Sequence, residues 1–169
     1  MIPASNDQAL ARIKAETLIE SLDWLREFHG KIVVVKFGGN AMVDEQLQLA
    51  FAQDMAYLRF VGIKPVVVHG GGPQITARLA ELGIESEFRA GMRFTDEQTI
   101  DVVKEVLREQ ISKSLAEQIQ ASGAKTIVLS GEDDSLFRAA KVMGKTPEGD
   151  VDLGLVGEVT TVNPRAVLK

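Results

Sequence analysis

The chain has 169 residues, of which 45% are hydrophobic and 25% are charged, so it has the length and composition of one folded domain, and wholesale disorder is excluded. It contains no cysteine, which excludes disulfides, thiolate zinc sites and cysteine nucleophiles, and its net charge of −5 argues against binding nucleic acid through bulk charge. Because the sequence shows no apolar run long enough to span a bilayer and no signal-peptide pattern, we expect a cytoplasmic protein.

The first predicted element is an amphipathic helix over residues 5–28. Apolar residues recur at helical spacing along one face, and the polar residues at its start can cap it. Two interpretations remain open: the helix packs on its own domain, or it packs on another subunit. In the second case the contacting residues would be Ala11, Leu18, Leu22 and Trp24. We therefore treat residues 1–29 as a candidate oligomerisation segment and residues 30–169 as one domain.

Two strand–turn–helix patterns follow this helix. Residues 31–36 and 65–69 are short β-branched runs, which are typical of strands buried on both faces of a parallel sheet. Each run ends at glycines and leads into a predicted helix, over residues 44–61 and 74–82 respectively. This alternation predicts an α/β fold, a three-layer αβα sandwich built on an open, mainly parallel sheet.

A longer helix is predicted for residues 95–121, where Thr95 and Gln98 have the spacing of a capping box. Residues 126–129 then have the composition of a third buried strand.

Two further strands are expected at residues 136–143 and 155–162, with a polar turn between them. Asn163 and Pro164 next form the pattern of a helix start, but few residues remain before Lys169. This ending predicts that the chain is cut inside a larger fold.

Candidate anion-binding turns follow the two parallel strands. Gly38 and Gly39 come after the first strand, and Gly70, Gly71 and Gly72 come after the second. Ligands of open α/β sheets bind at the carboxyl ends of strands, where glycine allows close approach and helix N-termini attract phosphate or carboxylate. The sequence has neither a Walker A pattern nor a dinucleotide-binding G-x-G-x-x-G pattern, which disfavours P-loop nucleotidases and Rossmann dehydrogenases.

Two basic residues are candidates for contacts with an anionic ligand. Lys36 ends the first strand beside Gly38, where its ammonium group either neutralises charge during phosphoryl transfer or simply extends into solvent. Arg93 lies in a loop after Gly91, where its guanidinium either binds a carboxylate bidentately or is merely solvated.

Two other features also have both a structural and a functional interpretation. His69 is either a hydrogen-bonded core residue or a catalytic group. The acidic run formed by Glu132, Asp133 and Asp134 either ligates magnesium or forms a solvated turn. Since the sequence contains only two histidines, a histidine-rich metal site is excluded.

Three segments together resemble a known family. They are Val35-Lys36-Phe37-Gly38-Gly39-Asn40, Val68-His69-Gly70-Gly71-Gly72-Pro73-Gln74-Ile75 and Gly91-Met92-Arg93-Phe94-Thr95-Asp96. In this order they are similar to the N-terminal half of the acetylglutamate kinases, a branch of the amino acid kinase family. The likeness covers about residues 31–163, and one mild departure is Phe94, where valine is common.

The resemblance implies an enzyme of arginine biosynthesis that uses ATP with Mg²⁺ and phosphorylates the side-chain carboxylate of N-acetyl-L-glutamate. It implies one catalytic residue, three glycines that bind the phosphoryl group and three residues that bind the substrate. The implied catalytic residue is Lys36. The implied phosphoryl-binding glycines are Gly38, Gly39 and Gly70, and the implied substrate-binding residues are Gly71, Gly72 and Arg93. A general base is not needed, because the acceptor carboxylate is already an anion.

The resemblance also places most of the nucleotide site on a C-terminal domain beyond Lys169. We therefore expect the 169-residue chain to be the substrate-binding half of the enzyme and to be inactive alone. The first helix is similar to that of the arginine-inhibited branch, which implies a homodimer or, through residues 1–29, a hexamer, with arginine feedback on the full-length protein. Two alternatives stay open: a non-catalytic module that binds a carboxylate and self-associates, and a related kinase for another carboxylate.

Overall fold

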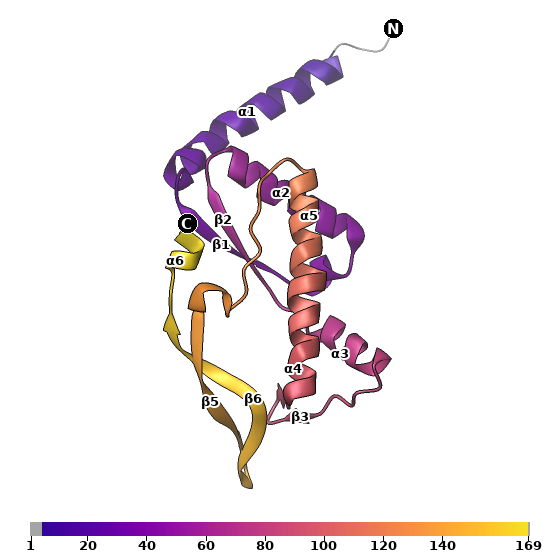
Figure 1. Ribbon diagram of the computed structural model, residues 1–169. Coiled ribbons are helices and arrows are strands. Elements are labelled where there is room, and N and C mark those ends of the chain that lie inside the picture. The colour runs from indigo at the N-terminus through magenta and orange to yellow at the C-terminus, as the bar shows by residue number, and fades with distance from the viewer. Residues whose placement is uncertain (1–4, 169) are drawn as a thin grey trace. The chain divides into compact units, whose positions relative to one another are not determined.

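The computed structural model describes residues 5–168 (Figure 1). The chain divides into two compact units, Met1–Val68 and His69–Lys169. Among the helices within residues 5–168, none is both long enough and apolar enough to cross a membrane.

The first unit contains the predicted N-terminal helix and a parallel pair of strands. Its elements are α1 (Ser5–Phe28), β1 (Ile32–Phe37), the 3-10 turn η1 (Gly39–Met42), α2 (Glu45–Phe60) and β2 (Lys64–His69). Strands β1 and β2 form a two-stranded sheet. Because the Lys64 amide donates to the Lys31 carbonyl at 2.9 Å, the strands begin side by side and therefore run parallel. The predicted α/β class is confirmed.

Local signals set the limits of α2. A carboxylate oxygen of Asp44 accepts a hydrogen bond from the Leu47 amide at 3.0 Å, which makes Asp44 the N-cap. Gly62 follows the last helical turn with a φ of +91°, a conformation that glycine adopts without strain. The helix buries an aromatic contact, because Phe51 stacks on Phe37 of β1 with ring centres 4.4 Å apart.

The burial of β1 differs from the prediction. Its side chains are mostly exposed or half-buried, and Val34 is 65% exposed. A parallel strand is buried on both faces only when neighbouring elements cover both faces of its sheet. Among the described residues β1 pairs only with β2. The β-branched run therefore predicts the strand correctly, but the predicted burial on both faces is wrong.

The second unit is built around a long helix. Its elements are α3 (Gly72–Glu81), β3 (Phe88–Arg89), β4 (Met92–Arg93), α4 (Glu97–Lys104), the π-helical segment η2 (Glu105–Ser112), α5 (Lys113–Ala121), the 3-10 turn η3 (Asp133–Ser135), β5 (Phe137–Thr146), β6 (Gly149–Val162) and α6 (Arg165–Leu168). Ile75 and Leu79 of α3 pack against Val102 of α4 and Val106 of η2 to form its apolar core.

One continuous helix is formed by α4, η2 and α5, in agreement with the predicted length (Figure 1). The predicted cap is wrong by one residue. The Asp96 carboxylate, and not the Thr95 hydroxyl, accepts the hydrogen bond from the Thr99 amide, at 2.7 Å. The Thr95 hydroxyl instead donates to the Arg93 carbonyl at 3.0 Å.

The strand predictions for the last third of the chain have mixed outcomes. The strands predicted at 136–143 and 155–162 form the antiparallel hairpin of β5 and β6, which is longer than expected and turns between Thr146 and Gly149. The strand predicted at 126–129 is wrong: within residues 5–168 no strand pairs with this segment, and Ile127 is 80% exposed. A β-branched run without a partner has no ladder of hydrogen bonds to hold it as a strand.

A short bridge fastens β6 to the segment before the long helix. The Thr95 amide donates to the Leu153 carbonyl at 3.1 Å, and the Leu155 amide donates to the Thr95 carbonyl at 2.6 Å. Gly154, between them, has a φ of +73°, and a Cβ there would lie 2.2 Å from the Thr95 carbonyl oxygen. Only glycine fits at this position.

Candidate functional site

Arg93 is positioned by a small hairpin that the sequence analysis did not predict. Strands β3 and β4 pair antiparallel, with Phe88 opposite Arg93. The two residues of the turn, Ala90 and Gly91, have φ values of 47° and 77°, which are characteristic of a type I′ turn. Gly91 was the available signal, because glycine in a two-residue connection is common in such hairpins.

The guanidinium group of Arg93 contacts the first turn of α3. Its Nη2 donates to the Thr76 hydroxyl at 2.8 Å and to the Gly72 carbonyl at 3.4 Å. Its Nη1 donates to the Ser86 hydroxyl, and its guanidinium carbon lies 4.8 Å from the centre of the Phe88 ring. The structure therefore brings Arg93 together with the last glycine of the Gly70–Gly72 turn.

Among the described residues, the guanidinium of Arg93 lacks the carboxylate partner that Arg89 and Arg108 of the same unit have. Arg89 pairs with Glu87 at 2.7 Å, and Arg108 pairs with Asp133 at 2.9 Å. Within residues 5–168 no carboxylate pairs with Arg93, and the oxygens that it binds are uncharged. A guanidinium that is oriented but not neutralised is suited to an anionic ligand.

The Gly70–Gly72 turn has an open part and a packed part. A Cβ at Gly70 or Gly72 would meet no atom within 4 Å, so the backbone there is accessible to a ligand. At Gly71, which is buried, a Cβ would lie 2.7 Å from side-chain atoms of both Leu107 and Ile111. The turn also precedes α3, whose N-terminus adds a positive field favourable to anions.

Lys36, Gly38 and Gly39 belong to the first unit. The side chain of Lys36 leaves the end of β1 beside Gly38, where a Cβ would lie 3.9 Å from the Lys36 Cε. Gly39 has a φ of +63°, and a Cβ there would meet no atom within 4 Å. In the described part of the chain no carboxylate pairs with Lys36. An exposed ammonium group thus lies next to an accessible glycine backbone, an arrangement that can hold a phosphoryl group.

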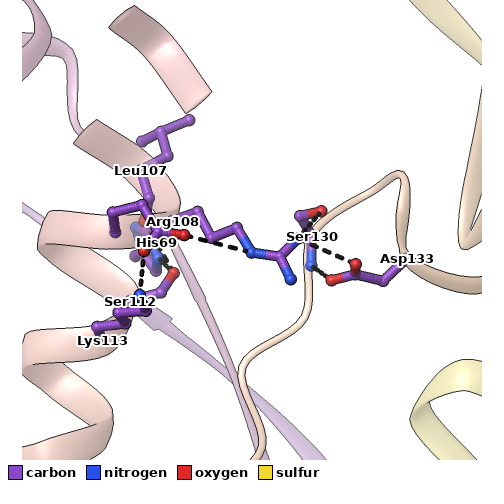
Figure 2. Close-up of polar contacts among 8 residues, drawn as sticks. His69, Leu107, Arg108, Ser112, Lys113, Ser130 and Asp133 are labelled. Atoms are coloured by element: carbon purple, nitrogen blue, oxygen red, sulfur yellow. Dashed lines mark hydrogen bonds and ion pairs between the residues drawn. The ribbon is translucent and has the colours of Figure 1, made fainter. Parts of the chain in front are cut away.

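His69 is tied to the middle of the long helix. Its Nε2 lies 2.7 Å from the Ser112 hydroxyl oxygen (Figure 2). Its Nδ1 lies 2.9 Å from the Gly70 carbonyl oxygen. The hydrogen-bonded interpretation of His69 therefore describes its position. No local pattern marks Ser112 as its partner, because the two residues are far apart in the chain.

Basic side chains of the long helix bind the acidic run that begins at Glu132. The guanidinium of Arg108 reaches Asp133 at 2.9 Å and the Ser130 hydroxyl at 3.0 Å (Figure 2). The Ser130 amide, followed by Arg108, lowers the pKa of Asp133 below its ordinary value. Lys104 donates to Glu132 at 3.1 Å.

These bonds favour the structural interpretation of the acidic run over the magnesium site. Among the described residues no group of three or more carboxylates or histidines is arranged to hold a metal ion.

The structure defines an α/β protein with glycine turns at the ends of two parallel strands. The chain belongs to the amino acid kinase family, whose model matches residues 31–169. The resemblance inferred from the three glycine-containing segments is therefore confirmed.

Curated relatives narrow the likeness further. The chain is 56% identical over 166 residues to the acetylglutamate kinase of Clavibacter michiganensis subsp. michiganensis, 52% identical over 166 residues to that of Saccharopolyspora erythraea and 48% identical over 163 residues to that of Acidothermus cellulolyticus. These matches cover 98%, 98% and 96% of this chain but 54%, 55% and 55% of the relatives. The chain thus spans about half the length of the curated relatives it matches.

Solved structures support the fold. The N-acetylglutamate synthase of Neisseria gonorrhoeae, complexed with coenzyme A and N-acetyl-glutamate, matches with a TM-score of 0.64 and 19% identity, over 91% of this chain and 34% of that one. The protein smu.665 of Streptococcus mutans UA159 matches with a TM-score of 0.60 and 25% identity, over 81% of this chain and 53% of that one. At these identities the likenesses show the fold alone.

Proposed function

We propose that this chain is the acceptor-binding part of an acetylglutamate kinase, a cytoplasmic enzyme of arginine biosynthesis that transfers the γ-phosphoryl group of ATP to N-acetyl-L-glutamate. The observation that carries the proposal is the placement of Arg93, whose guanidinium contacts Gly72 and has no carboxylate partner within residues 5–168. The curated relatives, which are acetylglutamate kinases, support this choice of acceptor.

In this proposal the side chains orient the acceptor and neutralise charge. Arg93 binds the α-carboxylate of N-acetyl-L-glutamate through its planar fork, and the amides of Gly71 and Gly72 bind the acceptor. Lys36 stabilises the negative charge of the transferring group. Phosphoryl oxygens are bound by Gly38, Gly39 and Gly70. Because the attacking carboxylate is already ionised, positioning and electrostatics supply the catalysis, and no proton has to be removed.

The described residues account for only part of the cofactor requirement. Accessible glycine amides and Lys36 suit the phosphoryl group that ATP donates. The carboxylates of the 132–133 run are paired with Lys104 and Arg108, so we assign no step to Mg²⁺ on these residues. We propose that the remaining nucleotide contacts lie outside this chain and that the 169-residue chain alone does not turn over.

Calorimetry with the complete natural protein tests the acceptor site. We expect N-acetyl-L-glutamate to bind, and we expect Arg93→Ala to weaken its binding about 10- to 100-fold, because a charged hydrogen-bonded pair is lost. Arg138→Ala removes an exposed arginine of β5 and serves as the matched control. Unchanged affinity in the Arg93→Ala protein would contradict the assignment.

The same titration separates the alternatives. Binding of a longer analogue, such as an N-acetylated aminoadipate, in preference to N-acetyl-L-glutamate would favour a related kinase with another acceptor. Binding of N-acetyl-L-glutamate without any phosphoryl transfer from ATP by the complete protein would favour a non-catalytic carboxylate-binding module.

A further inference from the structure

The geometry points to Ser112 as a positioning residue for the Gly70–Gly72 turn, acting through His69. Ser112 is the last residue of η2, the π-helical segment in the middle of the long helix. The inference rests on the proposed function, because it assigns a further residue to the same acceptor-binding turn.

A chain of polar contacts connects the helix backbone to the glycine turn. The Ser112 hydroxyl donates to the Leu107 carbonyl at 2.9 Å, since a carbonyl oxygen can only accept. The same oxygen lies 2.7 Å from Nε2 of His69, within hydrogen-bond distance. On its other side, the His69 ring faces the carbonyl of Gly70 at 2.9 Å, where the turn begins. Ser112 therefore fixes the imidazole ring, and the ring fixes the entry to the turn.

The wide helical turn explains why Ser112 reaches this position. In an α-helix, a serine hydroxyl bonds back to a carbonyl three or four residues earlier, as Ser122 does with Gln118 at 3.1 Å. Ser112 bonds instead to Leu107, five residues earlier. Such π-helical turns are rare in proteins, and those that occur are often found at functional sites. The unusual turn thus places a hydroxyl group against His69 (Figure 2).

Apolar packing from the same segment reaches the same turn. Leu107 and Ile111 of η2 lie where a side chain on Gly71 would be, each 2.7 Å from an added Cβ. One helical segment therefore supports the glycine turn with a polar contact at its entry and an apolar contact at its centre. Backbone N–H groups act on a transition state only when they are held in place, and a misplacement of about 1 Å can cost about 100-fold in rate.

Steady-state kinetics of the complete natural protein test this role. We expect Ser112→Ala to lower kcat about tenfold, because the turn loses part of its support, and to change the KM for ATP by less than about two-fold. Ser112→Thr keeps the hydroxyl group and should restore kcat to within about two-fold of the wild type. Ser122→Ala removes a serine hydroxyl from the end of the same helix, outside these contacts, and should leave kcat unchanged.

The ¹⁵N NMR signals of the His69 ring test the route independently of activity. We expect Ser112→Ala to shift the Nε2 signal and Ser122→Ala to leave it in place. An unchanged kcat in Ser112→Ala, or a lowered kcat with an unshifted His69 ring, overturns the inference. Equal losses in the Ala and Thr variants with a lowered Tm in both show a purely structural role and also overturn it. If the wild type itself transfers no phosphoryl group to N-acetyl-L-glutamate, the proposed function fails, and this inference fails with it.

Discussion

Gly62 shows how one residue can combine a backbone requirement with a packing requirement. Its φ of +91° favours glycine, and a Cβ there would lie 2.2 Å from two atoms of the His29 ring. That ring is held in place, because its Nδ1 lies 3.0 Å from the Val61 carbonyl oxygen. The end of α1 and the end of α2 are therefore joined at a point that admits no side chain.

We expect Gly62→Ala to lower the free energy of unfolding by about 2 kcal/mol or more, since backbone strain and a clash with His29 add together. Urea denaturation measures the change. Gly83→Ala is the matched control, because Gly83 also has a positive φ, +69°, but nothing lies within 4 Å of an added Cβ. It should cost only the strain, about 1 kcal/mol. Equal losses in the two variants would show that the His29 contact contributes nothing.

At the scale of elements, the start of the long helix depends on a charged cap. The Thr99 amide donates to the Asp96 carboxylate at 2.7 Å, and this bond lowers the pKa of Asp96 below its ordinary value. The native state then binds fewer protons than the unfolded chain. The resulting stability is present above the unfolded pKa of about 3.9 and is lost as the pH falls through the lower native pKa.

Asp96→Asn tests this contribution, because asparagine keeps an N-cap acceptor without the titrating charge. We expect the wild-type Tm to fall more steeply than the variant Tm between pH 7 and about pH 2.5. Other acids with lowered pKa values, such as Asp133 and Asp152, are present in both proteins and cancel in the comparison. Parallel Tm curves would contradict a charge-dependent cap.

The elements that the sequence predicts well are those with local signals. The limits of α2 follow from a capping aspartate and a terminal glycine, and the β5–β6 hairpin follows from two apolar runs around a polar turn. The strand prediction for residues 126–129 is wrong because a strand needs a pairing partner, which the residues of the segment itself do not specify. The π-helical turn of η2 has no local signal either, since apolar periodicity is the same for either helix type.

The residues of the candidate site likewise include some that the sequence indicates and others that only the fold reveals. Glycine runs, Lys36 and Arg93 stand out in the sequence because their residue types and positions after strands carry chemical meaning. The residues that orient Arg93, Thr76 and Ser86, come from a helix and a loop and have no distinguishing pattern. Ser112 is recognised only when the fold brings it to His69.

At the scale of the whole molecule, α1 exposes a large apolar surface. The exposed fractions are 58% for Ile13, 65% for Leu18, 71% for Ile19 and 64% for Trp24. Several large apolar side chains exposed along one helix suit burial against a partner. We propose that another copy of the protein covers it, in a homodimer or a hexamer, and that arginine regulates the full-length assembly.

Removal of residues 1–28 from the complete natural protein tests this proposal. We expect the oligomeric mass measured by mass photometry to fall, because the exposed apolar side chains of α1 are lost. The double variant Leu18→Gln with Ile19→Gln should have the same effect while keeping the helix, and Lys14→Gln, a change of a polar residue, should not. An unchanged mass after the deletion would refute a role for α1 in assembly.

The bridge between Thr95 and Gly154 also bears on the order in which parts of the second unit fold. It closes a loop of chain that contains the whole helix from Glu97 to Ala121, whereas the contacts within that helix are local. Closing a long loop costs more chain entropy than forming local contacts, so we expect the helix to form before the bridge. Arg93 lies just before this bridge, but its own contacts, to Gly72, Thr76 and Ser86, span much shorter stretches of chain and can form before the bridge does.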